Sequence, residues 1–368
     1  MNKFFPVAEP SITEREIRYV LDAVKSGWVS SLGHYIFDFE KRFAEYVGVK
    51  YALTTTNGTT ALHLALASLD IKGGDEVIVP DLTFVAVPNA VAYTGAKPVF
   101  VDIDLETWCI DPEAIKKAIT ARTKAIIPVH LYGHPADMDA VNQIAEEHGL
   151  YVIEDAAEAH GAEYEGKKVG SMGHVGVFSF YGNKVITTGE GGMITTDDEA
   201  VYERARFLRD HAMSKERRYW HTELGFNYRL TNIQAALGLA QLERIEELLD
   251  KKRLIFKSYE EFLGGFGAIR LNPEKKWARN TFWMVCLILG KDIKITRDEL
   301  MLELRKMGID TRPFFYPMSQ MPIYKSNSGN SAAYDISGKG LNLPSGGNLN
   351  RKDIEFISQS LLALLKHS

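Results

Sequence analysis

Two strand ends in the sequence carry side chains that could act together on a carbonyl or an amino group. Residues 151–155 have the pattern of a buried strand that ends on Asp155, and a second such strand, at 175–180, is followed by Lys184 in a glycine-flanked turn. Ligands bind at the carboxyl ends of strands in open α/β sheets. A buried lysine can form Schiff bases, and pyridoxal phosphate requires such a lysine plus a carboxylate that keeps its pyridine nitrogen protonated. From spacing alone, Asp155 could equally cap a helix and Lys184 could be a surface lysine.

A possible phosphate-binding turn lies earlier in the chain. The Asn-Gly-Thr sequence at 57–59 stands between a predicted strand at 51–54 and a predicted helix at 60–69. Backbone N–H groups at a helix start, with hydroxyl groups and a glycine nearby, bind phosphate, although the same residues suit a plain helix cap. Phe84 also follows a strand, so it could stack on a flat ring or pack in the core.

Two competing motifs are weaker. Residues 161–168 nearly match a nucleotide-binding P-loop, but Lys168 stands where Ser or Thr must bind magnesium, and 165–166 have the pattern of a hairpin turn. Asp102 and Asp104 resemble the metal-binding pair of glycosyltransferases, a signal that charged strand ends often imitate. We therefore expect neither motif to be functional.

Histidines give no clear metal site. His130 and His134 are four residues apart, but Gly133 and Pro135 argue against a helix that would present both to one ion. We expect no metal. His160 is of interest because it lies close in sequence to the candidate carboxylate.

Short apolar strands alternate with amphipathic helices and must position these residues. The predicted strands are 51–54, 76–80, 98–101, 125–130, 151–155, 175–180 and 192–196, with helices at 60–69 and 139–148. Continuous apolar runs, such as 126–129, are typical of strands that helices cover on both faces. The pattern predicts an α/β fold with a mostly parallel central sheet.

The chain is expected to divide into three parts. Residues 1–30 would form an N-terminal arm and helix, 31–250 a large domain and 251–368 a smaller αβ domain. A long helical pattern at 230–250 leads to the second boundary. The smaller domain would contain a strand at 282–289 and helices at 253–262, 297–307 and 351–365.

The N-terminal helix is predicted at 11–26. Ser11 could cap it, with Glu14 three residues later, and its apolar face would consist of Ile17, Val20, Leu21 and Val24.

Composition limits the class of protein. The 368 residues are 45% hydrophobic and 25% charged, which excludes intrinsic disorder. The net charge of −5, without a basic run, argues against nucleic acid or an anionic membrane as a partner. No apolar stretch reaches transmembrane length. Two distant cysteines suit a reducing compartment, so we expect a cytoplasmic protein.

Several segments resemble those of one enzyme family. They are 27–31, 57–63, 74–80, 130–133, 153–159 and 225–229. On these segments the chain resembles the DegT–StrS family of nucleotide-sugar aminotransferases, which have the aspartate aminotransferase fold, over nearly its whole length. The resemblance implies fold type I and pyridoxal 5'-phosphate (PLP) as the cofactor.

The resemblance implies a role for each candidate residue. The cofactor-binding residues would be Gly58, Thr59, Phe84, Asp155, Glu158, Ser179, Lys184, Asn227 and Arg229. Lys184 would form a Schiff base with the cofactor and move protons, and Asp155 would pair with the pyridinium nitrogen. Glu158 would lie near the ring hydroxyl, and Phe84 would stack on the ring.

The implied phosphate site draws on two subunits. Gly58, Thr59 and Ser179 would hold the phosphate from one chain, and Asn227 and Arg229 would reach it from the neighbouring chain. The expected assembly is therefore a homodimer with composite active sites.

The resemblance also implies a reaction. The expected transfer is from L-glutamate to C-4 of a GDP-4-keto-6-deoxy-mannose-type nucleotide sugar, for bacterial surface polysaccharide. The segments 179–193, 311–317 and 341–345 favour this substrate, and the alternative is another 3-keto or 4-keto sugar on UDP or dTDP. The substrate-binding residues would be Trp28, Ser30, Ser31, Arg312 and Tyr316.

Two other classes of function fit the sequence less well. A regulatory descendant without activity is disfavoured because both Lys184 and Asp155 are present. A glycosyltransferase that uses Asp102 and Asp104 is a more distant alternative. Dehydratases related to this family have His in place of the lysine, so Lys184 favours transamination.

Overall fold

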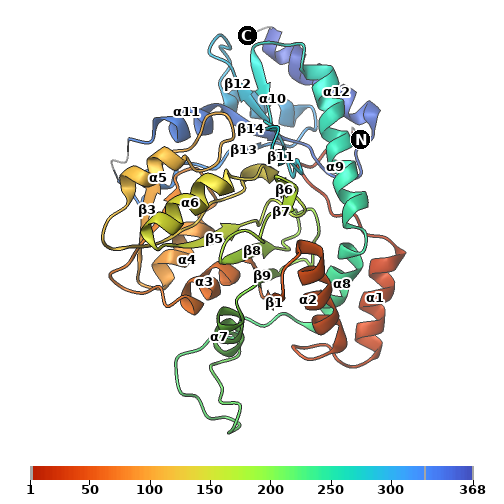
Figure 1. Ribbon diagram of the computed structural model, residues 1–368. Helices are drawn as coiled ribbons and strands as arrows, with labels where there is room; N and C mark the ends of the chain where they lie inside the picture. Colours follow the sequence, from red (N-terminus) through yellow and green to blue (C-terminus); the bar gives the residue numbers. More distant parts are fainter. Residues whose placement is uncertain (1–2, 327–328, 367–368) are drawn as a thin grey trace.

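A seven-stranded sheet forms the centre of the computed structural model, which describes residues 3–326 and 329–366 (Figure 1). Neighbouring strands are parallel except at β9, which runs antiparallel to both β8 and β1. The expected α/β fold with a mostly parallel sheet is confirmed. In order across the sheet the strands are β3 (Lys97–Val101), β2 (Glu76–Pro80), β4 (Thr123–Ile126), β5 (Tyr151–Asp155), β8 (Val175–Ser179), β9 (Gly192–Thr196) and β1 (Tyr51–Thr55).

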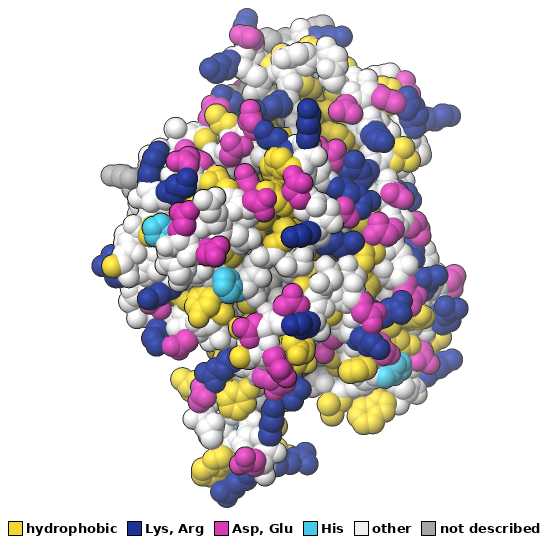
Figure 2. Space-filling view, viewed as in Figure 1, with side chains coloured by type: hydrophobic (Ala, Val, Ile, Leu, Met, Phe, Trp, Pro, Cys, Tyr) yellow, Lys and Arg dark blue, Asp and Glu magenta, His cyan; other side chains and the backbone are white. Residues whose placement is uncertain are grey.

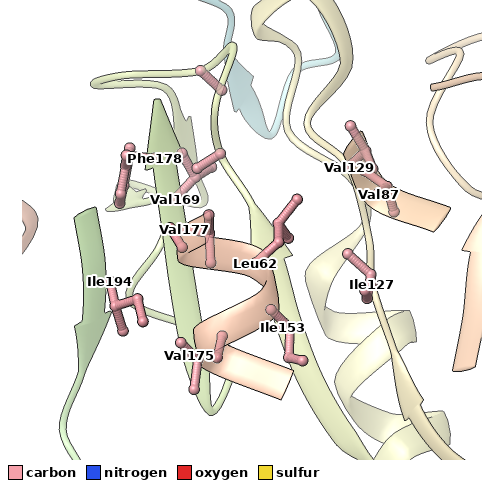
Figure 3. Close-up of a cluster of buried hydrophobic side chains, with 14 of the residues drawn as sticks. Leu62, Val87, Ile127, Val129, Ile153, Val169, Val175, Val177, Phe178 and Ile194 are labelled. Atoms are coloured by element: carbon pink, nitrogen blue, oxygen red, sulfur yellow. The ribbon is translucent and has the colours of Figure 1, made fainter. Parts of the chain in front are cut away.

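Helices cover both faces of this sheet (Figure 1). They are α2 (His34–Val47), α3 (Gly58–Ser68), α4 (Ala86–Tyr93), α5 (Pro112–Ala118), α6 (Met138–His148), α7 (Glu199–Arg209) and α8 (Asn232–Leu242). Because the central strands are buried on both faces, they carry apolar side chains toward both helix layers. Figure 3 shows Leu62 of α3 in one cluster with Ile153 of β5 and Val177 of β8. This core fixes the carboxyl ends of β5 and β8 side by side, as parallel neighbours.

A second, antiparallel sheet follows in the C-terminal part of the chain. Its strands, in order, are β10 (Ile269–Leu271), β12 (Val285–Leu289), β14 (Gly340–Leu343) and β13 (Arg312–Pro313). The helices of this part are α9 (Ile245–Leu263), α10 (Arg297–Lys306), α11 (Ser331–Lys339) and α12 (Arg351–Lys366). A separate apolar cluster, which includes Leu287 and Ile357, lies in this part. The domain boundary expected at 250 falls inside α9 and stays a prediction.

A short hairpin occupies the segment that nearly matched a P-loop. Its strands β6 (Glu163–Tyr164) and β7 (Lys167–Lys168) pair with each other, and β6 also pairs with β11 (Ala278–Arg279). Glu165 and Gly166 both have positive φ, 49° and 77°, as a tight hairpin turn requires. The predicted hairpin turn is confirmed, and this segment lacks the strand-to-helix setting of a P-loop.

The N-terminal helix α1 (Glu14–Lys25) begins later than expected. Thr13, rather than Ser11, caps it, and Glu16 closes the capping box. The predicted apolar face is not buried within this chain, because Ile17, Leu21 and Val24 are each about half exposed. Glu16 is buried instead, since its carboxylate pairs with Arg244 at 2.7 Å. A charged contact with a distant residue thus decides which side of the helix faces inward.

The helix expected at 230–250 is two helices. α8 ends at Leu242 and α9 begins at Ile245, with Arg244 between them at φ −115° and ψ 10°. The Arg244 guanidinium bridges Glu16 of α1 and Glu247 in the first turn of α9. Helical periodicity runs through the junction, so the break could not be seen in the sequence.

The strand expected at 125–130 is shorter than predicted. β4 ends at Ile126, and Pro128, which has no backbone N–H, stands in its continuation.

The surface carries charges of both signs, interspersed over the face shown in Figure 2. Hydrophobic side chains gather toward the lower end of that face, where Figure 1 places α1, α2 and the segment after α7. No helix within the described ranges 3–326 and 329–366 is both long and apolar enough to cross a membrane. The large exposed apolar side chains of α1 and the loop after it are Ile17, Leu21, Val24, Trp28, Val29 and Leu32.

Candidate active site

One cavity of about 370 Å³ lies at the carboxyl ends of β5 and β8. It is the position that open α/β sheets offer to ligands. The structure brings together here most of the residues expected to bind the cofactor. Those that line the cavity are Gly58, Thr59, Phe84, Asp155, Glu158, Ser179 and Lys184.

Lys184 follows β8 in a turn closed by a hydrogen bond from its backbone N–H to the Tyr181 carbonyl, at 2.9 Å. Its side chain exposes only 11% of its surface, and its Nζ lies 3.7 Å from Glu158 Oε1. Burial lowers the pKa of this amine, and the carboxylates of Glu158 and Asp155 partly oppose that effect. The surface-lysine interpretation is wrong.

Asp155 is the last residue of β5 and is buried. Its Oδ1 accepts a hydrogen bond from the Ala157 N–H at 3.0 Å. The segment 156–162, which is described throughout, contains turns rather than a helix, so Asp155 is no helix cap. Burial raises the pKa of this carboxyl, while Lys184 opposes the shift. A cationic group in the cavity would stabilise its ionised form.

Glu158 is held by the main chain. The Tyr132 N–H donates to Glu158 Oε2 at 2.9 Å, and Tyr132 adopts a left-handed conformation with φ 53° and ψ 21°. Burial raises the pKa of Glu158 to about 7, against the opposing effect of Lys184. The pair therefore combines an acid and a base that burial shifts toward their neutral forms.

The first turn of α3 faces the cavity. Asn57 caps this helix, since its Oδ1 accepts the Thr60 N–H at 2.9 Å, and the first N–H groups, at Gly58 and Thr59, have no partner within the helix. A Cβ on Gly58 would lie 2.9 Å from the Ser179 Cβ, so only glycine allows this approach to β8. The turn at 57–59 can therefore both cap the helix and bind a phosphate.

Phe84 is not a core residue. Its side chain exposes 54% of its surface, and its ring lies 5.6 Å from that of Phe315 at the cavity wall. An aromatic face is therefore available to a flat ligand.

Other cavity residues were not found by sequence reasoning. Trp283 and Phe315 come from the C-terminal part and line the same cavity. The Tyr132 ring lies parallel to both, with interplanar angles of 15° and 16°. Nothing distinguishes Trp283 from core residues in the apolar run around it, so no sequence signal could have singled it out.

A second cavity of about 860 Å³ adjoins the first and shares Phe84, Trp283 and Phe315 with it. Arg312 and Tyr316, two of the expected substrate residues, line it. Both are about half exposed. Asp310 orients the Arg312 guanidinium, since Arg312 Nη1 lies 2.5 Å from Asp310 Oδ1.

The remaining expected residues lie outside both cavities of this chain. Asn232 fixes the loop that contains Trp28, Ser30 and Ser31, because its side chain donates to the Trp28 carbonyl at 2.7 Å and its N–H to the Ser30 carbonyl at 2.6 Å. Elsewhere, Asn227 Oδ1 accepts from the Arg229 guanidinium at 3.0 Å, and that guanidinium also pairs with Asp210.

The competing motifs have structural roles. Asp102 accepts the N–H groups of Ala332 and Ala333 at the start of α11, at 3.0 and 2.9 Å. His130 pairs with Glu154 at 3.0 Å, and His134 bonds the Pro135 carbonyl.

The main cavity fits PLP on its own chemistry. It offers helix N–H groups to a phosphate and an exposed aromatic face to a ring. It also offers a buried carboxylate to a pyridinium nitrogen and a buried amine to an aldehyde. These features occur around one space rather than at separate sites.

Comparisons with known proteins agree with this chemistry. The model of the DegT/DnrJ/EryC1/StrS aminotransferase family matches residues 10–362. GDP-perosamine synthase of Escherichia coli O157:H7 is 45% identical over 360 residues, 98% of each chain. That of Caulobacter vibrioides is 48% identical over 358 residues, 96% of each chain. A putative sugar aminotransferase of Streptococcus pneumoniae, solved in its PLP form, is 28% identical, with a TM-score of 0.94 and 99% of each chain covered.

Proposed function

The chain belongs to the DegT/DnrJ/EryC1/StrS aminotransferase family and is a PLP-dependent sugar aminotransferase, and we propose that it transfers an amino group from L-glutamate to C-4 of GDP-4-keto-6-deoxy-D-mannose. The observation that carries this substrate is the similarity to two GDP-perosamine synthases over nearly the whole chain. The products would be 2-oxoglutarate and GDP-perosamine, a precursor for bacterial surface polysaccharide. A cytoplasmic location is part of the proposal, supported by two free, buried cysteines, Cys109 and Cys286.

The residues around the main cavity would hold the cofactor. The N–H groups of Gly58 and Thr59 and the Ser179 hydroxyl would bind its phosphate, and Phe84 would stack on its ring. Asp155 would accept a hydrogen bond from the protonated pyridine nitrogen, which would supply the cationic partner for this buried carboxylate. When bound, PLP supplies an aldehyde that captures amines and a ring that withdraws electrons from the reacting carbon.

Lys184 would move the proton in both halves of the reaction. Its Nζ would take the proton from the α-carbon of glutamate and, in the second half, deliver a proton from its ammonium form to C-4 of the sugar. A lysine does this near neutral pH only if its pKa is lowered, which burial achieves here. Glu158, 3.7 Å away, would keep the amine from losing its proton too readily.

The adjoining cavity would accept the sugar nucleotide. It opens beside Phe84 and has room for a ligand larger than glutamate, at about 860 Å³. Arg312 and Tyr316 are suited to phosphate and sugar groups, since guanidinium binds phosphate in a bidentate manner.

The loop with Trp28, Ser30 and Ser31 lies outside both cavities of its own chain. We include it in the substrate site as part of the dimer proposal.

The active form would be a two-fold dimer. Asn227 and Arg229 lie outside the cavity of their own chain, and α1 presents apolar side chains to solvent. A two-fold interface that covers this apolar face would bury it twice and could bring Asn227 to the partner's phosphate site. Each dimer would then contain two equivalent composite sites.

The test is amino transfer across a panel of keto nucleotide sugars. The purified enzyme, with L-glutamate, is supplied with GDP-4-keto-6-deoxymannose and with 3-keto and 4-keto sugars on UDP and dTDP, and products are identified by mass and NMR. We expect a C-4 amine on the GDP sugar at the highest kcat/KM. A UDP or dTDP sugar as the best substrate would overturn the substrate while leaving the aminotransferase class intact.

A further inference from the structure

The Lys184 amine has a neighbour to which the proposed chemistry gives no role. Its Nζ lies 3.9 Å from the centroid of the Trp283 ring. Trp283 exposes 4% of its surface and stands just before β12, in the C-terminal part of the chain. An ammonium group over the face of an indole is attracted by the ring's quadrupole, and this attraction is strongest away from water.

The same indole also holds the main chain beside the lysine. Its Nε1–H donates to the Asn183 carbonyl at 2.7 Å, one residue before Lys184. The backbone of Trp283 is itself fixed, because its carbonyl accepts a hydrogen bond from Lys252 Nζ of α9 at 2.9 Å. The Tyr132 ring lies parallel to the indole, with centroids 6.1 Å apart. The edge and the face of one rigid ring therefore contact two consecutive residues.

We propose that Trp283 is a positioning residue of the proposed reaction: its ring face holds the Lys184 amine whenever that amine is not joined to the cofactor, and its N–H fixes the turn that carries the lysine. The inference rests on the proposed function, since an amine that leaves and returns in each cycle must stay within reach. It also connects the lysine to the C-terminal sheet through the start of β12.

Three titratable groups also face the amine. The Glu158 and Asp155 carboxylates favour its charged form. Burial lowers the pKa of His160 to about 3, so this ring is neutral near pH 7. The Trp283 face adds an attraction for the charged amine without adding a charge. An aliphatic side chain there would keep the surroundings apolar and remove that attraction.

The test measures the free amine directly. The full-length protein, loaded with pyridoxamine phosphate so that Lys184 is free, is acetylated with trace acetic anhydride over a pH series, and modification of Lys184 is read by mass spectrometry. In Trp283→Leu the midpoint should move to lower pH by about one unit, the scale of a buried cation–π contact. In Trp283→Phe, which keeps a ring face, it should move less.

A matched control separates positioning from general packing. Trp108 is buried to 1% exposure and lies outside both cavities, so Trp108→Leu should leave the midpoint unchanged. An equal shift in Trp108→Leu, or no shift in either Trp283 variant, would overturn the proposal. If Trp283→Leu does not fold, Trp283→Phe decides alone: the weaker attraction of a phenyl ring should still lower the midpoint, and a wild-type midpoint would overturn the proposal.

Turnover provides a second readout. Trp283→Leu should slow both half-reactions in single-turnover experiments at saturating substrate, and Trp283→Phe should restore part of the rate. The labelling needs no turnover, so an enzyme that labels as expected but aminates none of the sugars would contradict the proposed function alone.

Discussion

The Glu158 carboxylate and the Lys184 amine lie 3.7 Å apart, on side chains that expose 6% and 11% of their surfaces. Burial shifts each toward its neutral form, raising the pKa of Glu158 to about 7 and lowering that of Lys184. Burial therefore brings the pKa of the acid and the pKa of the base closer together, in the direction that general acid–base chemistry favours.

Glu158→Gln should extend activity to lower pH. Lys184 can take a proton only when neutral, so its pKa sets the acid limb of the glutamate half-reaction. Loss of the negative charge should lower that pKa and move the limb down by about one unit. The rate difference between the variant and wild type depends on an ionised Glu158, so it should fade below about pH 7, where this carboxyl is protonated. Single-turnover rates over a pH series measure this.

The control for that experiment is Glu163→Gln, which removes a carboxylate of the β6–β7 hairpin and should leave the profile unchanged. An acid limb that stays in place in Glu158→Gln would mean that the carboxylate does not act on the lysine.

Lys184→Ala should lose turnover by at least about a thousand-fold with the fold intact, because no other amine lines the described cavity. Borohydride reduction of the native protein should fix the cofactor at Lys184, as read by peptide mass. Lys167→Ala, in the exposed hairpin, is the matched control. Labelling at another lysine, or full activity of Lys184→Ala, would contradict the role of Lys184 as the lysine that binds the cofactor.

Gly58→Ala should weaken PLP binding and destabilise the protein by about 1–3 kcal/mol, the usual cost of overpacking. The new Cβ would lie 2.9 Å from that of Ser179, so α3 must move away from β8. Thermal melts with and without PLP measure both effects. Gly265→Ala serves as the control, since a Cβ there meets nothing within 4 Å. Equal melts and equal PLP affinity in the two variants would contradict the close-approach argument.

Arg312→Ala should raise the KM for the sugar nucleotide by about ten-fold or more, the scale of one charge-assisted contact. The KM for glutamate should change little, because the guanidinium lines the larger, adjoining cavity. Steady-state kinetics with each substrate varied in turn check this, with Arg351→Ala as a surface control. Equal increases for both substrates would argue against a selective role.

Two defective chains should restore activity when they are co-expressed. If Asn227 serves the partner's site, Lys184→Ala and Asn227→Ala chains would form heterodimers with one intact and one doubly damaged site. Random mixing would restore about a quarter of all sites. Heterodimers purified with two tags provide the measurement. Activity no higher than that of the parents mixed after folding, or a monomer in solution, would contradict the composite site.

The elements that carry the chemistry were largely predictable from sequence. The strands at 76–80, 151–155 and 192–196 have the expected bounds, and all of their residues except Tyr151 are buried, as is typical of central strands between two helix layers. Asp155 is the last residue of the strand at 151–155, and Lys184 comes after β8, which ends at Ser179, one residue before its expected end. Gly58 lies at the start of α3, where the turn pattern placed it.

What could not be predicted depends on contacts between distant residues. The buried side of α1 is decided by Glu16 and Arg244, which are 228 residues apart. Trp283 reaches Lys184 only because the C-terminal part packs against the large sheet. Apolar periodicity indicates which face of a helix or strand is apolar, but it does not indicate which distant residues contact that face.

Tyr132 shows how a site can depend on the main chain more than on a side chain. The hydrogen bond that holds Glu158 comes from a backbone N–H, so among substitutions at 132 only proline deletes the donor itself. Only a change of backbone conformation can misdirect it, and φ 53° is a conformation that β-branched residues resist. A residue at this position must therefore satisfy two demands at once, a left-handed backbone and an aromatic ring that is buried against Trp283 and Phe314.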